Sequence, residues 1–301
     1  MKWIIFTNDN SIIDSISNEL VAQDKKNKIV TCDFELENLL IHKKEMKDYA
    51  GCIIYSDKED KISSDLKTIL SSIYGFLASD KVAVLTNLNF LINNAYFSVD
   101  GLIGCKDCDA IINYIHKHYE SLSKESIKRL SKKKLLDKGI PFTPDCFATY
   151  IAKNKLPIVK EFLKAEMSIN SKDDMGVPML NVACRNDNFE FVEMFLKLGA
   201  KINAVSDDRG YTAVMDAVWR GNEKITKFLI EKGADLNTIN KEGQTNLILA
   251  VGANRESLVQ LLAENGADPD VKDMMGMSAY TYAVLFKKEK LVEILKPYHK
   301  E

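Results

Sequence analysis

The sequence predicts an α/β domain followed by an all-α solenoid of helical repeats. Two observations lead to this prediction. In the first part of the chain, short apolar segments alternate with helical patterns, which is typical of a parallel sheet covered on both faces. In the second part, a phrase of about 33 residues returns four times, with its glycine at positions 176, 210, 243 and 276. We therefore expect two domains, over residues 1–120 and 121–301.

The first domain contains five expected strands, each followed by an expected helix. Five such units predict a doubly wound sheet of the flavodoxin-like kind, whose functional site lies at the carboxyl ends of the strands. The expected strands cover residues 3–7, 28–32, 52–56, 82–85 and 102–105, and the expected helices cover 11–23, 35–44, 63–78, 89–97 and 109–119.

Polar residues follow four of these strands: Asn8 and Asp9, then Asp57, Thr86 and Lys106. This set resembles the receiver domain of bacterial response regulators. The resemblance implies that Asp57 accepts a phosphoryl group, that Asp9 and Asp57 hold Mg²⁺ with Asn8 in the second acidic slot, and that Thr86 and Lys106 contact the phosphoryl group. It also implies a histidine kinase as a partner. Oxygen ligands suit Mg²⁺, and a lysine offsets the charge of a phosphoryl group.

The first domain also departs from the receiver pattern. Asn8 replaces a carboxylate, no proline follows Lys106, and Ile103 stands where many receivers carry an aromatic switch residue. The alternative is therefore a degenerate, structural module in which Asp9 and Asp57 cap loops and Lys106 is a solvated surface residue.

Each part of the repeated phrase has a physical role. Glycine allows positive φ in the turn, and Thr212 or Thr245 can cap the next helix. Apolar residues at helical spacing then form a face that neighbouring copies bury, and the pairs Gly233-Ala234 and Gly266-Ala267 end the second helix. The phrase is similar to the ankyrin repeat, and a single copy cannot close a core, so the copies must stack.

The ankyrin resemblance covers roughly residues 123–297. A half-unit is expected over residues 134–140, and an irregular copy without the opening glycine over 144–170, where Pro157 suits the first turn of a helix. Lysines near residue 287 give the last copy a polar outer face, which is typical of a capping repeat.

The resemblance implies a concave surface, made of turn tips and inner helices, that binds a protein partner. Aromatic residues, methionine and arginine at such positions are typical of binding hot spots. The partner-binding candidates are Met175, Arg185, Arg209, Tyr211, Trp219, Arg220, Met274, Met275, Met277 and Phe286. Alternatively, the first domain, the C-terminal tail or a second subunit covers this apolar set.

The composition argues against several other classes of protein. A net charge of −2 gives no general attraction to nucleic acid or to anionic membranes, and no segment is long and apolar enough for a membrane span or a signal peptide. We therefore expect a cytoplasmic protein with reduced cysteines. Cys105 and Cys108 have the spacing of a redox or zinc pair, but no second pair or histidine cluster completes a zinc site. Seven basic residues between positions 124 and 138 indicate either a solvated helix face or a site for an acidic partner.

The sequence therefore predicts a cytoplasmic bacterial signalling adaptor rather than an enzyme, with no cofactor other than Mg²⁺. In one version phosphorylation regulates the repeats; in the other the protein is a constitutive scaffold. A small-molecule-binding enzyme of flavodoxin-like fold is a third reading, but no glycine-rich phosphate loop follows the first strand, and no catalytic triad can be assigned.

Overall fold

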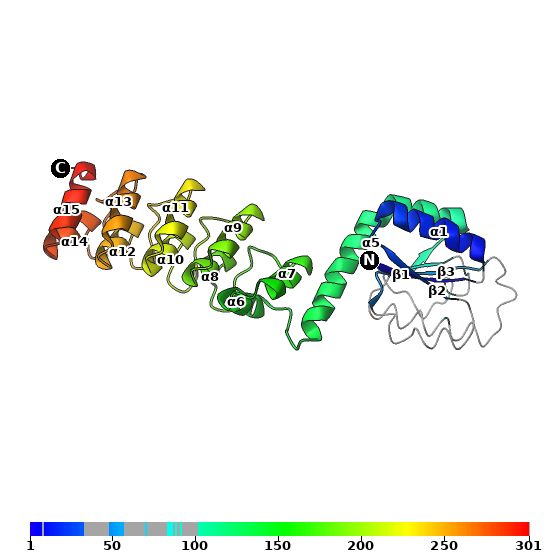
Figure 1. The fold of residues 1–301 in the computed structure, drawn as a ribbon. Helices are drawn as coiled ribbons and strands as arrows, with labels where there is room; N and C mark the ends of the chain where they lie inside the picture. Colours follow the sequence, from blue (N-terminus) through cyan, green and yellow to red (C-terminus); the bar gives the residue numbers. More distant parts are fainter. Residues whose placement is uncertain are drawn as a thin grey trace. The chain divides into compact units, whose positions relative to one another are not determined.

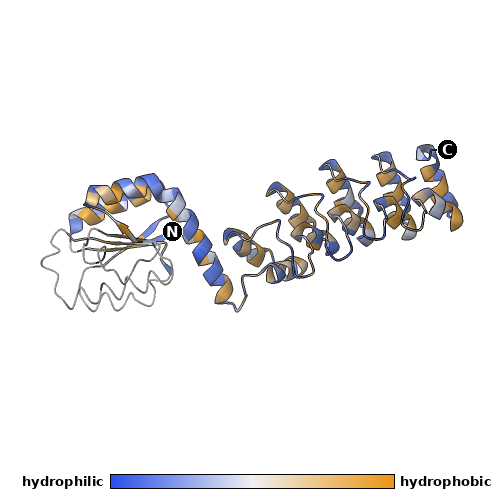
Figure 2. Cartoon of the chain, turned by 180° about the vertical axis from the view of Figure 1, so that it is seen from behind, coloured by the Kyte–Doolittle hydropathy of each residue, from blue (hydrophilic) through white to orange (hydrophobic). Residues whose placement is uncertain are grey.

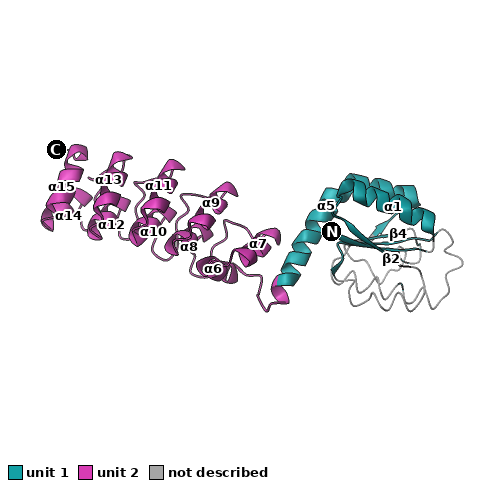
Figure 3. Cartoon of the chain, viewed as in Figure 1, with its two compact units in different colours: residues 1–134 teal, residues 135–301 magenta. Residues whose placement is uncertain are grey.

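A computed structural model describes residues 1–7, 9–32, 48–56, 70, 83–86, 88, 91 and 102–300. The chain divides into two compact units, residues 1–134 and 135–301 (Figure 3). Each unit has its own hydrophobic core.

The first unit contains a five-stranded sheet in which every neighbouring pair of strands is parallel. The strand order is β2-β1-β3-β4-β5. The strands are β1 (Lys2–Phe6), β2 (Lys28–Cys32), β3 (Gly51–Ile54), β4 (Ala83–Thr86) and β5 (Leu102–Gly104). The predicted parallel sheet is therefore present, because near-continuous apolar strands are stable where both faces of a sheet are buried.

Helices α1 (Asn10–Gln23) and α5 (Cys108–Leu136) lie on the same face of the sheet (Figure 1). Alternate strand residues, including Trp3 and Ile53, form one buried cluster with Ile16 of α1 and Ile115 of α5. The expected helices over residues 35–44, 63–78 and 89–97 lie outside the described residues, apart from Leu70 and Leu91, which are buried.

Helix α5 is longer than the sequence pattern predicted, because it continues past residue 119 to Leu136. Two buried positions in its second half hold Ser126 and Ser131 rather than apolar residues. The Ser126 hydroxyl donates a hydrogen bond of 2.6 Å to the Ala50 carbonyl. This part of α5 is largely hydrophilic in Figure 2, so the apolar periodicity of the sequence does not predict that the helix continues past residue 119.

Five helix pairs follow one another through the described residues of the second unit, with a short 3-10 turn, η4 (Lys296–Tyr298), at its end (Figure 1). The first helix of each pair packs on the first helix of the next. The pairs are α6 (Pro144–Ala152) with α7 (Leu156–Lys164), α8 (Met179–Arg185) with α9 (Phe189–Lys197), α10 (Ala213–Arg220) with α11 (Glu223–Glu231), α12 (Asn246–Gly252) with α13 (Glu256–Glu264), and α14 (Ala279–Leu285) with α15 (Glu289–Leu295).

The local signals in the repeats act as the sequence predicted. The turn glycine Gly210 has φ of 72°, and the helix-ending Gly233 has φ of 84°. The Thr212 and Thr245 hydroxyls accept hydrogen bonds from backbone amides in the first turns of α10 and α12. Pro157 lies in the first turn of α7, in the irregular copy. A continuous apolar core then runs through all five pairs.

Candidate functional site

We call the first helix of each pair the inner helix and the second the outer helix. One polar side chain shapes the turn before each of the inner helices α8, α10, α12 and α14. Asp173 Oδ1, for example, accepts hydrogen bonds from the amides of Met175 and Val177 at 3.1 and 2.8 Å. Asn240 and Asp273 serve their own turns in the same way, and in the remaining turn the Ser206 hydroxyl accepts from the Tyr211 amide at 3.0 Å. These bonds fix the shape of each turn, so the residue at its tip is held outward.

Backbone hydrogen bonds join each turn to the next. The amides of Asp207, Lys241 and Met274 donate to carbonyls in the preceding turn at 2.9, 3.1 and 3.3 Å. The turn glycines permit this close approach, since a Cβ at Gly243 would lie 2.9 Å from the Met274 nitrogen. The tips therefore form one continuous strip of surface.

Most of the predicted partner-binding residues are exposed on this strip or at the ends of the inner helices. At the tips, Met175, Met274 and Met275 are 63%, 77% and 80% exposed, Arg209 is exposed and Met277 is half-buried. At the helix ends, Trp219, Arg220 and Phe286 are exposed.

Tyr211 and Arg185 differ from that expectation. Tyr211 is only 5% exposed, and its ring meets the edge of Trp219 with ring centres 6.5 Å apart. Arg185 crosses to the next repeat, where Nε donates to Asp216 at 2.8 Å and the two terminal nitrogens donate to Asp208 at 2.8 and 3.1 Å. Both residues therefore act mainly within the solenoid.

The polar cluster around Arg185 is largely buried. Asp216 is 1% exposed and also accepts a 2.8 Å hydrogen bond from Asn181. Burial raises the pKa of Asp216 to about 6, against the attraction of Arg185. Burial also pushes the pKa of Asp208 upward, but the hydrogen bonds from Arg185 and Ser206 hold it well below its usual value.

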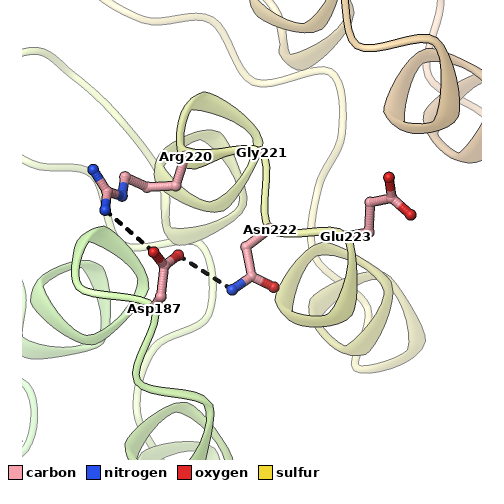
Figure 4. A pocket seen from close by; sticks show the side chains of 5 residues that line it. All are labelled: Asp187, Arg220, Gly221, Asn222 and Glu223. Carbon is pink, nitrogen blue, oxygen red and sulfur yellow. Dashed lines mark hydrogen bonds and ion pairs between the residues drawn. The ribbon is translucent and has the colours of Figure 1, made fainter.

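The loop between the two helices of each pair contains one residue with positive φ, at an equivalent position in all five pairs. These residues are Asn154, Asp187, Gly221, Asn254 and Lys287. Asp187 accepts hydrogen bonds from Arg220 and Asn222, both at 3.2 Å, and Figure 4 shows Glu223 pointing away from that pair. The residues in Figure 4 line an open pocket of about 390 Å³.

A second ladder between repeats was not predicted from the sequence. The Asn170 side chain donates to the Gly199 carbonyl at 3.2 Å and accepts from the Lys201 amide at 2.8 Å. Asn203, Asn237 and Asp270 make corresponding bonds to the segment that follows each of them. Their spacings of 33, 34 and 33 residues match the period of the glycines and could have revealed the ladder.

At the strand ends of the first unit, the structure describes three of the five predicted residues. Asp9 caps α1, and its Oδ1 accepts from the Ser11 amide at 2.9 Å. Thr86 is fully buried and its hydroxyl accepts from the Leu88 amide at 3.1 Å, whereas Lys106 is exposed. Asn8 and Asp57 lie outside the described residues.

The cysteine pair near the end of β5 has raised thiol pKa values. Burial, followed by the charge of Asp107, raises the pKa of Cys105; burial, followed by the charges of Asp109, Asp107 and Asp9, raises that of Cys108. A raised pKa disfavours the thiolate that redox and zinc chemistry need. Both thiols are free, and within the described ranges no group of three or more His, Cys, Asp or Glu residues is placed to hold a metal ion.

The basic stretch of α5 takes part in packing within the first unit. Arg129 donates to the Tyr49 carbonyl, Lys133 pairs with Asp48, and Lys128 pairs with Glu125 at 3.6 Å. These contacts favour a helix face engaged with the rest of its own unit over a free basic surface. Across the described part of the chain, no helix combines the length and apolar character needed to cross a membrane.

The chain belongs to the ankyrin repeat family. The family described as "Ankyrin repeats (3 copies)" matches residues 146–240 and 233–301, which together make up just over half of the chain. The repeats are thus assigned by both the fold and the family match.

Individual relatives share the repeats. A putative ankyrin repeat-containing protein of Treponema pallidum is 34% identical over 46% of this chain and 46% of its own length. A putative ankyrin repeat protein of Borreliella burgdorferi is 30% identical over 31% of this chain and 46% of its own length. The mouse protein named protein phosphatase 1 regulatory subunit 27 is 29% identical over 39% of this chain and 77% of its own length. The chain thus spans less than half the length of the first two of these relatives.

Proposed function

We propose that this protein is an adaptor that binds another protein through its turn tips and inner helices. The observation that carries this proposal is the exposure of large apolar side chains at these two places: Met175, Met274 and Met275 at the turn tips, and Trp219 and Phe286 at the ends of inner helices. Large apolar side chains are enriched at binding hot spots, and extended exposed apolar patches are unusual on soluble monomers.

The family and its members support a binding role rather than catalysis. Solenoid repeats present extended surfaces that are used for binding. One relative is named as a regulatory subunit of a protein phosphatase, and such a name describes a protein that works together with another protein. The free cysteines of the described residues support a reducing, cytoplasmic setting for the adaptor.

Site-specific photo-crosslinking tests this adaptor function. A photoreactive amino acid replaces Trp219 or Met175 on the proposed binding side and, as a control, Lys227 on outer helix α11, all three of which are exposed. In cells of the source organism, we expect discrete protein adducts from the first two positions and none from Lys227. Equal labelling at all three positions, or no adduct at any, would refute the adaptor.

We further propose that the first unit is a receiver-like domain of flavodoxin-like fold that regulates the adaptor. The strand order β2-β1-β3-β4-β5 is that of flavodoxin-like sheets. Asp9 and Lys106 lie just after the carboxyl ends of β1 and β5, and Thr86 is the last residue of β4. In this proposal Asp57 accepts the phosphoryl group from a histidine kinase, and Mg²⁺ binds at Asp9 and Asp57.

Beryllofluoride binding in the presence of Mg²⁺ tests the regulated version, with amide hydrogen exchange as the measurement and Asp57→Asn as the control variant. We expect protection around Asp9, Thr86 and Lys106 that extends into the repeats and is absent in Asp57→Asn. If beryllofluoride changes no exchange rate at millimolar Mg²⁺, the first unit is a constitutive structural module and the adaptor is unregulated by phosphorylation.

A further inference from the structure

The residue two positions before the positive-φ residue of each inter-helix loop occupies an equivalent place in every repeat, at or next to the last residue of the inner helix. In three consecutive repeats this residue is Trp219, Gly252 and Leu285, and the first and third are 51% and 61% exposed. Ala253 and Phe286 follow the second and third. A Cβ added to Gly252 would meet no heavy atom within 4 Å. We call these five residues the Gly252 step: a repeat with almost no side chain, between two repeats that carry large exposed apolar ones.

The two aromatic side chains of the Gly252 step, Trp219 and Phe286, each pack against another ring. Trp219 meets Tyr211 edge to face, with ring centres 6.5 Å apart. Phe286 stacks on Tyr282 with ring centres 5.7 Å apart and ring planes 8° apart. Because these rings are already ordered, a partner that contacts them loses little further side-chain entropy.

The width of the step suits a compact partner segment. Packed helices lie about 8–10 Å apart, so α10 and α14, with α12 between them, are separated by about 16–20 Å. An α-helix with its side chains is about 10–12 Å wide. One helix or one extended segment can therefore lie over α12, with Trp219 on one side and Phe286 on the other.

The loops beside the step carry positive charge. Residues 253–255 and 286–288 include Arg255, Lys287 and Lys288 and no Asp or Glu. Lys288 Nζ donates to the Val251 carbonyl at 2.6 Å. Among the described residues, neither Arg255 nor Lys287 forms an ion pair, whereas the nearby Arg220 and Lys290 each do.

The acidic residues nearest to these cations in sequence begin the outer helices. Glu256 begins α13 and pairs with Lys290 at 3.6 Å, and Glu289 begins α15. The situation differs one repeat earlier, where Asp187 neutralises Arg220 (Figure 4). The positive charge at Arg255 and Lys287 is therefore available to an external carboxylate.

We propose that the Gly252 step binds an acidic, apolar segment of the partner protein, with a leucine or phenylalanine side chain over Gly252 and carboxylates against Arg255 and Lys287. This proposal rests on the adaptor function and specifies its partner. Apolar contact supplies most of the affinity, because the flanking aromatic rings become desolvated. The charges select acidic over basic segments and speed association.

A peptide-binding measurement on the full chain tests the proposal. The probe is a fluorescein-labelled amphipathic peptide with leucine and phenylalanine on one face and glutamate on the other. Two matched peptides replace every glutamate by lysine, or every leucine and phenylalanine by serine. We expect saturable binding of the first peptide by fluorescence anisotropy, and at least about 10-fold weaker binding of the other two.

Variants of the protein locate the site. Gly252→Leu fills the open space without a clash, so it is expected to fold normally and to weaken the acidic peptide at least about 10-fold. The double variant Arg255→Glu, Lys287→Glu is expected to weaken it by a similar factor at low salt and less at high salt. Leu198→Ser, at an exposed apolar residue outside the step, is expected to leave binding unchanged.

The outcomes separate this inference from the adaptor function. If the acidic peptide fails to bind, binds no better than the lysine peptide, or is unaffected by Gly252→Leu, the proposed partner chemistry is wrong. Adducts at Trp219 in the crosslinking experiment would still support an adaptor in that case. If crosslinking also gives no adducts, the adaptor function fails as well.

Discussion

The substitution Arg185→Met removes the positive charge from the buried cluster between the second and third helix pairs, and so tests how far Arg185 stabilises the ionised Asp216. In the wild-type protein, burial raises the pKa of Asp216 from its ordinary value of 3.8 to about 6. One pKa unit corresponds to about 1.4 kcal/mol, so holding Asp216 ionised in the folded state costs about 3 kcal/mol. Arg185 limits this cost through its charge and its 2.8 Å hydrogen bond.

The pH dependence of stability follows from the direction of that shift. Between pH 3.8 and about 6, the folded protein keeps the Asp216 proton that the unfolded chain releases, so stability falls as pH rises and then levels off. Without Arg185, the folded pKa of Asp216 rises further and the fall continues above pH 6. At pH 7.5 we expect the ionisation of Asp216 to lower the free energy of unfolding of Arg185→Met by about 2 kcal/mol more than that of wild type. This pH lies about 1.5 units above the wild-type pKa of about 6, and each unit corresponds to about 1.4 kcal/mol.

Urea unfolding at pH 5 and pH 7.5 measures this effect. The fluorescence emission of Trp219 reports on the repeats, and Trp3 of the first unit is present in every variant. At pH 5 Asp216 is mostly protonated in both proteins, so we expect mainly the cost of losing the charge-assisted hydrogen bonds to Asp208, about 2 kcal/mol, which is the same at both pH values. Arg220→Met is the matched control: its ion pair with Asp187 is about half exposed, so we expect a change within about 0.5 kcal/mol at either pH. A loss for Arg185→Met that is equal at both pH values, or no larger than the control, would refute the reasoning.

Three further predictions concern the backbone and the C-terminal end. Gly243→Ala and Gly276→Ala impose the same left-handed strain, with φ of 76° and 75°, but only at Gly243 would the Cβ meet the next turn, at 2.9 Å. We expect Gly276→Ala to cost about 1 kcal/mol in urea unfolding and Gly243→Ala at least about 1 kcal/mol more; equal costs would contradict the close approach. Lys287→Gly removes a strained φ of 51° and is expected to stabilise the protein by about 1 kcal/mol, whereas a loss of stability would show that the lysine side chain holds the loop. Burial pushes the pKa of Asp270 upward, but the hydrogen bond from the Lys300 amide helps to hold it below its usual value, so its stabilising effect is present above that usual value and is lost as pH falls below it. Asp270→Asn should therefore flatten the acid dependence of stability and speed hydrogen exchange of the Lys300 amide, and an unchanged pH profile would argue against this role.

The repeats were predictable from the sequence because their signals are local. A threonine three residues before an amide it can cap, as at Thr212 and Thr245, needs no information from the rest of the chain. The same holds for Gly210 and Gly233, where only glycine adopts positive φ without strain. Repetition of these signals at one period then predicts the stacked arrangement.

The roles of Arg185 and Tyr211 were not predictable in this way. At the sequence level both occupy variable positions of the binding side. Arg185 turns to the neighbouring repeat because of Asp208 and Asp216, which lie 23 and 31 residues further along the chain. Tyr211 is buried beside Trp219. Side-chain networks between repeats therefore require the three-dimensional structure.

The second half of α5 escaped prediction for a different reason. Ser126 and Ser131 fill buried positions where hydrophobic periodicity expects apolar residues. The Ser126 hydroxyl is satisfied by a carbonyl 76 residues earlier in the chain, at Ala50. At the strand ends, Asp9 lies after β1 as the sequence predicted, whereas Thr86 is the last residue of β4 rather than the first residue after it. The beryllofluoride experiment tests their proposed chemistry.

The ladder of Asn170, Asn203, Asn237 and Asp270 has a mechanical consequence. Each of these side chains ties its own segment to the next, at intervals of one repeat. A pull applied along the solenoid would load these ties in series, so each would carry the same tension while the extension is shared among them. The repeats would then behave as a soft spring that lengthens in equal increments, and a partner held across several repeats would experience a change in their spacing as a change in fit.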